Sequence, residues 1–209
     1  MHLSINLSLI IITTLISLGG FSNEKIKDDL IFYPPAITTQ NQWYRFFTCG
    51  FIHADFTHLL FNMLTLYFFG DVVEDALNEL FGASGKWLYL ALYVSALLVS
   101  LLPTYLKNRN NYNYRSLGAS GAVSAVLFAG LMLAPTAEIY FYFIKMPSFV
   151  FAPLYLIFTA IMDRRGRDNI NHSAHLWGSL YGLAFIIIAC RFSGYPIVQN
   201  AIEQIRAFF

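Results

Sequence analysis

Two short segments far apart in the chain carry the residue types that acyl transfer needs. Ser120 lies in the sequence Gly-Ala-Ser-Gly at residues 118–121, and His175 lies in Ala-His-Leu-Trp-Gly at residues 174–178. A serine hydroxyl is a weak nucleophile until a base takes its proton, and neutral imidazole is the usual base near pH 7. If folding brings the two side chains together, Ser120 can attack a carbonyl carbon with His175 as general base.

Acyl transfer also needs hydrogen-bond donors for the negative oxygen of the tetrahedral intermediate. Losing one such donor typically costs about 2.7–4 kcal/mol of transition-state stabilisation. His58 and Asn62 are spaced i, i+4, so a helix would place them on one face. The backbone N–H of Ser120, near a helix start, would be a third donor. No aspartate lies at a depth suited to a triad, because Asp55 is nearer the entrance of its helix, so we expect a Ser–His dyad.

The composition indicates that most of the chain lies in lipid. Of the 209 residues, 57% are apolar and 12% are charged, and this charged fraction is about half that of soluble domains. A net charge of +1 without long charged runs excludes a nucleic-acid partner. We predict an all-α, polytopic membrane protein with a bundle of six transmembrane helices, from these apolar stretches: Leu3–Phe21, His53–Val73, Trp87–Leu106, Gly118–Glu138, Pro147–Met162 and His172–Cys190.

This topology brings the candidate residues to one depth. Alternate helices cross the membrane in the same direction, so the second, fourth and sixth all begin at one face. Four of the five histidines lie at two of these beginnings, and Ser120 lies at the third. At 1.5 Å per residue, His175 is only about 5 Å inside its helix. Ionisable residues in spans usually face a bundle interior or a water-filled cavity, which makes these histidines functional candidates.

Glycines would let the two catalytic helices approach each other closely. Gly178 and Gly182 form a GxxxG pattern after His175, and Gly118 and Gly121 flank Ser120. Small residues in such patterns allow helix backbones to come into contact. We therefore expect the fourth and sixth helices to pack against each other beside the site.

The rest of the chain contains no second domain. We predict a single membrane domain over residues 1–209, with a long loop at residues 22–50 and an interfacial amphipathic tail at residues 195–209. Cys49 and Cys190 have no disulfide-framework spacing, so we expect free thiols at opposite membrane faces.

Several of these segments together resemble the rhomboid intramembrane serine proteases, over roughly Trp43 to Phe185. The matching pieces are Trp43-Tyr44-Arg45, His58-Leu59-Leu60-Phe61-Asn62, Gly118-Ala119-Ser120-Gly121 and Ala174-His175-Leu176-Trp177-Gly178. The motif GxSG alone is a weak signal, because it occurs again at Gly82-Ala83-Ser84-Gly85. Because successive helices cross the membrane in alternate directions, Ser84 should lie at the face opposite the four histidines, where we interpret it as a turn residue.

The resemblance implies an activity and a role for each residue. Ser120 would attack the scissile carbonyl, His175 would act as base and then acid, and His58, Asn62 and the Ser120 amide would hold the oxyanion. The implied partners are transmembrane protein substrates and the lipid bilayer, with no cofactor and no metal. A substrate helix must unwind locally to expose its peptide bonds. We expect an integral multi-pass protein of the plasma (inner) membrane.

Two features depart from the family. Some relatives carry a tyrosine one turn after the nucleophile that packs on the base, and this chain has Ser124 there. Nine Lys and Arg residues lie in loops on the expected active-site side and four on the other, although the richer side is normally cytoplasmic. Because a multi-residue site match is more specific than a loop count, we follow the family and expect an extracytoplasmic site.

Two other functions stay open at the level of sequence. His53, His58, His172 and His175 could ligate zinc in a membrane metallohydrolase, although the chain has no HExxH motif and Ser120 would then be unexplained. A rhomboid-like pseudoenzyme could bind transmembrane helices without cutting them, although such relatives typically lack the serine or the histidine.

Overall fold

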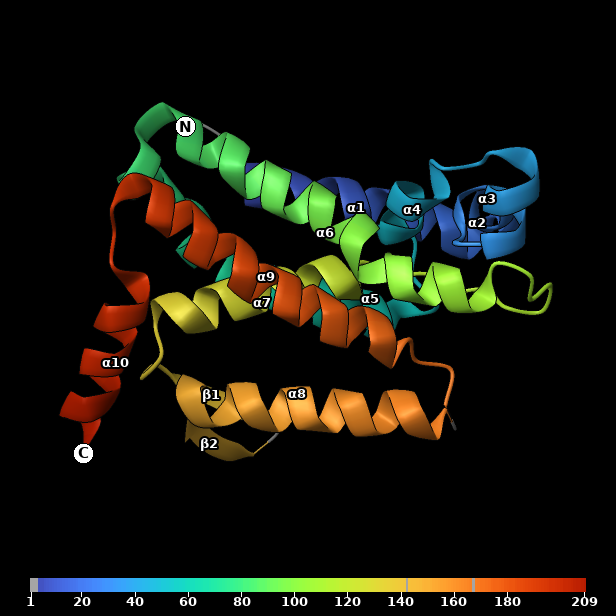
Figure 1. Cartoon of the computed structure of the whole chain (residues 1–209). Coiled ribbons are helices and arrows are strands. Elements are labelled where there is room, and N and C mark those ends of the chain that lie inside the picture. The colour runs from blue at the N-terminus through green and yellow to red at the C-terminus, as the bar shows by residue number, and fades with distance from the viewer. Residues whose placement is uncertain (1–3, 142, 167) are drawn as a thin grey trace.

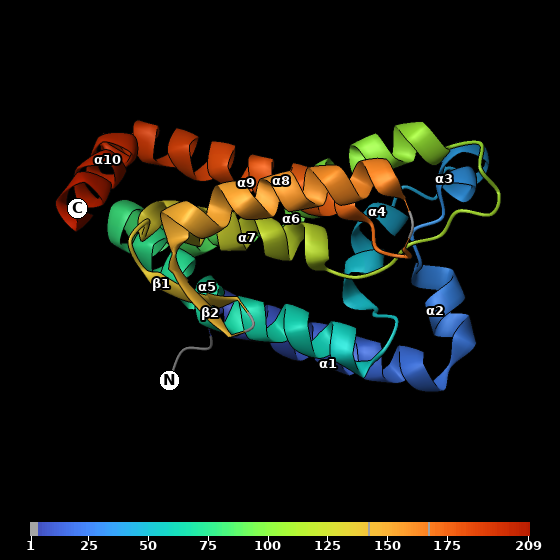
Figure 2. The same ribbon diagram turned by 90° about the horizontal axis from the view of Figure 1, so that it is seen from below.

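The computed structural model describes residues 4–141, 143–166 and 168–209. The long helices lie side by side in one bundle (Figures 1 and 2). They are α1 (Ile5–Ser22), α5 (Phe56–Phe81), α6 (Gly85–Asn108), α7 (Ser120–Leu133), α8 (Ser148–Arg165) and α9 (His172–Ser193). The predicted all-α membrane bundle is confirmed.

Three stretches are long and apolar enough to cross a membrane. They are Ile5–Ser22, Phe56–Asn108, which contains both α5 and α6, and His172–Ser193. Helix α7 is apolar but shorter, and α8 ends in the charged residues Asp163, Arg164 and Arg165. The number of six spans therefore stays a prediction.

Helix α7 is the centre of the bundle. Every residue from Gly121 to Leu131 is buried, because α5, α6 and α9 surround this helix. A helix that is hydrophobic on all sides needs such surroundings. Because α7 is central, its first residue, Ser120, lies close to residues of several other helices.

The predicted fourth stretch, Gly118–Glu138, is too long at its C-terminal end. Helix α7 ends at Leu133, and after it the strands β1 (Glu138–Phe141) and β2 (Ile144–Pro147) pair antiparallel. Pro135 follows the helix by two residues, where a proline cannot continue the helical hydrogen bonding. Tyr140 and Phe141 end β1, and Ile144 begins β2.

The loop at residues 22–50 is a folded layer over one end of the bundle. It contains α2 (Glu24–Leu30), α3 (Pro34–Gln40), α4 (Arg45–Thr48) and the start of the 3₁₀ turn η1 (Cys49–Phe51). Buried Arg45 holds this layer together, since its Nη1 donates to the carbonyls of Asp28 and Ile31 at 2.8 Å each. Backbone hydrogen bonds between Phe32 and Ser116 then attach the layer to the segment before α7.

The opposite end of the bundle carries the second serine motif and the tail. Ser84 lies in the 3₁₀ turn η2 (Gly82–Ser84) that links α5 to α6, away from the histidines, as predicted. The tail forms α10 (Ile197–Phe208), which packs on α7 and α9 at its buried residues Ile197 and Ala201 (Figure 1). Cys49 and Cys190 are free, as predicted.

Candidate active site

Ser120 is the first residue of α7, and the backbone before it is fixed on both sides. The N–H of Gly118 donates to the carbonyl of Cys49 at 2.9 Å, and the N–H of Ala119 donates to Nε2 of His53 at 3.4 Å. His53 is itself fixed by a 2.9 Å hydrogen bond between Nδ1 and the Ser17 hydroxyl. Ser120 therefore stands on a rigid turn, half-buried at the N-terminal end of a helix dipole.

His58 lies directly against this turn. A Cβ at Gly118 would come within 2.6 Å of Cε1 of His58, and Gly118 has a φ of 114°, which side chains rarely tolerate. Asp55 begins α5 by accepting a 2.8 Å hydrogen bond from the N–H of His58. Because Gly118 has no side chain, the His58 ring can lie against the turn that precedes Ser120.

Asn62 follows His58 by one turn on α5, as its spacing predicts. Its Nδ2 donates to the carbonyl of His58 at 2.9 Å, within its own helix. One of the two Nδ2 hydrogens is therefore engaged, and the other has no acceptor among the described residues.

Helices α7 and α9 touch through glycines at the level of the site. A Cβ at Gly178 would overlap the carbonyl of Gly121, and a Cβ at Gly182 would overlap the carbonyl of Ala125. This is the backbone contact that the glycine spacing predicts, and it lies beside both Ser120 and His175. Among the described residues no hydrogen bond joins Ser120 to the His175 ring, and such bonds are often long in enzymes without substrate.

A second histidine, His172, packs against His175, and its sequence context indicates no specific role for it besides that of a possible zinc ligand. The rings of His172 and His175 lie edge to face with centroids 5.9 Å apart. Nε2 of the buried His172 is 3.0 Å from Oδ2 of Asp168, and this hydrogen bond holds the pKa of the Asp168 carboxyl below its usual value. Asp168 is not among the residues that the sequence motifs indicate, although its i, i+4 spacing to His172 was an available signal.

The tyrosine absent at position 124 has a counterpart on another helix. The hydroxyl of Tyr155 on α8 lies 3.3 Å from the hydroxyl of Ser124. Tyr155 also contacts the ring of Phe128, one turn after Ser124 on α7. A tyrosine from α8 therefore occupies the space beside Ser124.

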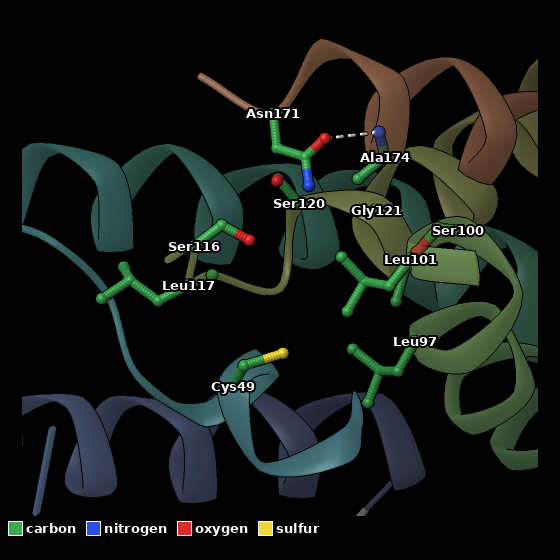
Figure 3. Close-up of a pocket in the computed structure, with 12 residues that line it drawn as sticks. Cys49, Leu97, Ser100, Leu101, Ser116, Leu117, Ser120, Gly121, Asn171 and Ala174 are labelled. Carbon is green, nitrogen blue, oxygen red and sulfur yellow. Dashed lines mark hydrogen bonds between the residues drawn. The ribbon is translucent and has the colours of Figure 1, made fainter. Parts of the chain in front are cut away.

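A small cavity lies beside Ser120, between α6, α7 and the start of α9 (Figure 3). Its lining includes Cys49, Ser100, Gly121 and Asn171. Burial raises the pKa of the Cys49 thiol to about 12, so this thiol is protonated at neutral pH and is a poor nucleophile. Cys49 is therefore a weaker nucleophile candidate than the serine hydroxyls that line this cavity, among which Ser120 is the one at the start of α7.

The zinc alternative requires several histidines to converge on one point. In the part of the chain that the structure describes, no three His, Cys, Asp or Glu side chains are grouped closely enough to hold a metal ion. His53 faces Ser17 and Ala119, whereas His172 faces Asp168, so their ring nitrogens serve different partners.

Comparison with known proteins places this arrangement in a family. A family model described as Rhomboid domain matches residues 40–192, which include every candidate site residue. The chain is 34% identical over 171 residues to "Rhomboid-like protein 11, chloroplastic" of Arabidopsis thaliana, covering 76% of this chain and 56% of that protein. It is 31% identical over 144 residues to "RHOMBOID-like protein 12, mitochondrial" of the same plant, covering 63% and 42% respectively.

The match to a bacterial relative covers similar shares of the two proteins. The chain is 28% identical over 157 residues to "Putative rhomboid protease YdcA" of Bacillus subtilis (strain 168), covering 70% of this chain and 68% of that protein. By contrast, the chain spans only about half the length of the two plant relatives. With its apolar helices, the match over residues 40–192 identifies an integral membrane protein, and the chain belongs to the rhomboid family.

Proposed function

We propose that this protein is an intramembrane serine endopeptidase that cleaves transmembrane segments of other proteins through a Ser120–His175 dyad. The observation that carries the proposal is the glycine contact between α7 and α9, because it holds the helices of the nucleophile and the base together at one level. Family membership and a bacterial relative whose name contains rhomboid protease support the same activity.

In the proposed first step, Oγ of Ser120 attacks the scissile carbonyl carbon while its proton passes to His175. The carbonyl oxygen becomes negative, and the Ser120 N–H, His58 and Asn62 donate hydrogen bonds to it. His175 then gives its proton to the leaving amine, which leaves an acyl-enzyme on Ser120. In the second step a water attacks the ester with His175 again as base, and Ser120 is regenerated.

The proposed substrate is a transmembrane helix that unwinds near the membrane face. A helix in lipid satisfies its backbone hydrogen bonds internally, so its peptide bonds are exposed only after local unwinding. An extracytoplasmic site and the plasma (inner) membrane stay predictions, and two relatives are named for a mitochondrial and a chloroplast location instead.

The test compares the wild type with Ser120→Ala, His175→Ala and Ser84→Ala, purified in detergent and given a model transmembrane substrate. We expect both site variants to lose activity by on the order of 10⁴-fold or more. Ser84→Ala is the matched control, because it changes the same motif at the far end of the bundle, and should cleave at the wild-type rate. Normal cleavage by Ser120→Ala, or loss of wild-type activity with a chelator, would refute the dyad.

The pseudoenzyme alternative is tested in the same preparation. A folded wild-type protein that binds the substrate helix but neither cleaves it nor reacts with a fluorophosphonate at Ser120 would favour the non-catalytic function. Labelling of the wild type but not of Ser120→Ala supports the protease.

A further inference from the structure

Asn171 presents a hydrogen-bond donor that the proposed dyad does not use. The residue immediately precedes α9 and lines the same cavity as Ser120. Its Nδ2 is buried and has no hydrogen-bond partner among the described residues. In Figure 3 this nitrogen lies on the Ser120 side of the cavity.

The orientation of the Asn171 amide is fixed by its oxygen. Oδ1 accepts hydrogen bonds from the N–H of Ala174 at 3.1 Å and from the Thr104 hydroxyl at 3.0 Å. A flipped amide would turn its NH₂ group toward the N–H of Ala174, so that two donors faced each other. The Nδ2 group must therefore point away from both partners.

An unpaired buried donor is costly unless another state of the protein uses it. Leaving such a group unsatisfied destabilises the folded state, because the donor has lost its hydrogen bonds to water and gained none in return. Serine or aspartate would begin the helix equally well without bringing an NH₂ group to the cavity. A donor that is fixed in advance and shielded from water is the kind of group that stabilises charge developing in a transition state.

We propose that Nδ2 of Asn171 donates a hydrogen bond to the scissile carbonyl oxygen as Ser120 attacks, as a further catalytic donor of the oxyanion site. This inference rests on the proposed protease function. The bond from Oγ to carbon forms, the carbonyl π electrons move to oxygen, and the Oγ proton passes to His175, while Asn171 keeps its own protons. Asn171 would add a donor from the residue that immediately precedes α9, whereas His58 and Asn62 lie on α5.

A purely structural role must be separated from this one, because Asn171 also begins the helix that carries His175. The carbonyl of Asn171 accepts from the N–H of His175 at 3.3 Å, and its side chain caps the helix. Asn171→Ser keeps a capping oxygen and removes the NH₂ group. Asn171→Asp keeps the acceptor for both Ala174 and Thr104 and also removes the donor.

The test measures kcat, KM and the thermal unfolding midpoint of these two variants on the model transmembrane substrate. We expect kcat to fall by about 10²–10³-fold, with KM and the unfolding midpoint close to the wild-type values. A peptide aldehyde, whose adduct with Ser120 develops an oxyanion, should bind more weakly by a similar factor. Thr104→Val, which removes one partner of Oδ1 but leaves the donor, should lose clearly less activity than Asn171→Ser.

The outcomes separate this inference from the proposed function. If a variant folds like the wild type and keeps its kcat, or changes only KM, the oxyanion role of Asn171 is wrong while the Ser120–His175 protease stands. If Asn171→Ser unfolds, Asn171→Asp decides the question by the same criteria. If the wild type does not cleave, or Ser120→Ala still does, the proposed function fails and the inference fails with it.

Discussion

Ser120 and Ser84 occupy identical GxSG motifs, so their surroundings must distinguish them. Ser84 lies in an exposed turn between two helices. Ser120 follows a turn held by Cys49 and His53 and begins a helix that is buried on all sides. The difference is in the backbone that presents each hydroxyl, and it follows from contacts made far away in the sequence.

Gly118 is the residue at which this presentation is most easily broken. In Gly118→Ala the new Cβ would lie 2.6 Å from Cε1 of His58, at a φ of 114°. We expect a loss of stability of about 1–3 kcal/mol from overpacking and strain and a loss of cleavage of at least 10²-fold, because His58 must move. Thermal unfolding and cleavage rates measure the two effects.

The control for this substitution is Gly166→Ala, at another glycine of positive φ with nothing within 4 Å of its Cβ position. It should share the backbone strain without the loss of cleavage. Equal activity of the two variants would show that His58 does not depend on Gly118.

Asp168 should give the protein a characteristic acid dependence. Its folded pKa is lowered by the hydrogen bond from His172, so its contribution to stability is present above the unfolded pKa of about 3.9 and disappears as the pH falls through the folded value. The wild type should therefore unfold at a higher temperature than Asp168→Asn at pH 6, and the difference should shrink below about pH 4. A difference that does not change with pH would argue against this hydrogen bond.

At the scale of elements, the α7–α9 crossing determines whether the site can assemble. In Gly182→Ala a methyl group would meet the carbonyl of Ala125, so the helices must separate. We expect a destabilisation of about 1–3 kcal/mol and slower cleavage. Gly19→Ala on α1 is the matched control, because its nearest neighbour would be Ile26 Cδ1 at 3.7 Å, and it should be neutral or slightly stabilising. Similar unfolding midpoints for the two variants would contradict the crossing as described.

The helices could be predicted from sequence where hydrophobicity alone defines them. The sequence stretches for α1, α6, α8 and α9 agree with the structure to within a few residues. The prediction failed for the end of α7, because Ala134 and Ala137 continue the run of uncharged residues after Leu133 and only Pro135 marked the change. The folded layer at residues 22–50 was also missed, since short helices there depend on tertiary bonds such as those of Arg45.

Some residues of the candidate site could likewise be predicted from local sequence, and others could not. Motif spacing selected Ser120, His175, His58 and Asn62 as candidates, because their chemistry and helix periodicity are local signals. The donor of Asn171 could not be found in this way, since its importance lies in a missing partner that only the folded arrangement reveals. Its type, a preferred helix-capping residue just before α9, was the one local signal.

At the scale of the whole molecule, a buried carboxylate joins helices by hydrogen bonds at the end of the bundle away from the site. Glu74 on α5 accepts hydrogen bonds from the N–H groups of Ile5 and Asn6 at 2.9 and 2.8 Å. The Asn6 side chain also accepts from the hydroxyl of Tyr89 on α6 at 2.8 Å. One cluster thus joins α1, α5 and α6, and the carboxylate lies at the positive end of the α1 dipole.

Glu74→Gln tests whether this cluster stabilises the fold without taking part in the chemistry. The neutral amide would turn its NH₂ group toward one of the two backbone donors, and we expect a loss of about 1.5–3 kcal/mol because each bond is made to a charged, buried group. Glu79→Gln makes the same chemical change at an exposed position of α5 and should leave the unfolding midpoint unchanged. At temperatures below its unfolding transition, the Glu74→Gln variant should react with a fluorophosphonate at Ser120 as fast as the wild type does. The reason is that the Glu74 cluster lies at the end of the bundle away from Ser120. Slower labelling of the folded variant would mean that the packing of α1 against α5 is transmitted along the bundle to His58, and the two ends could then no longer be treated as independent.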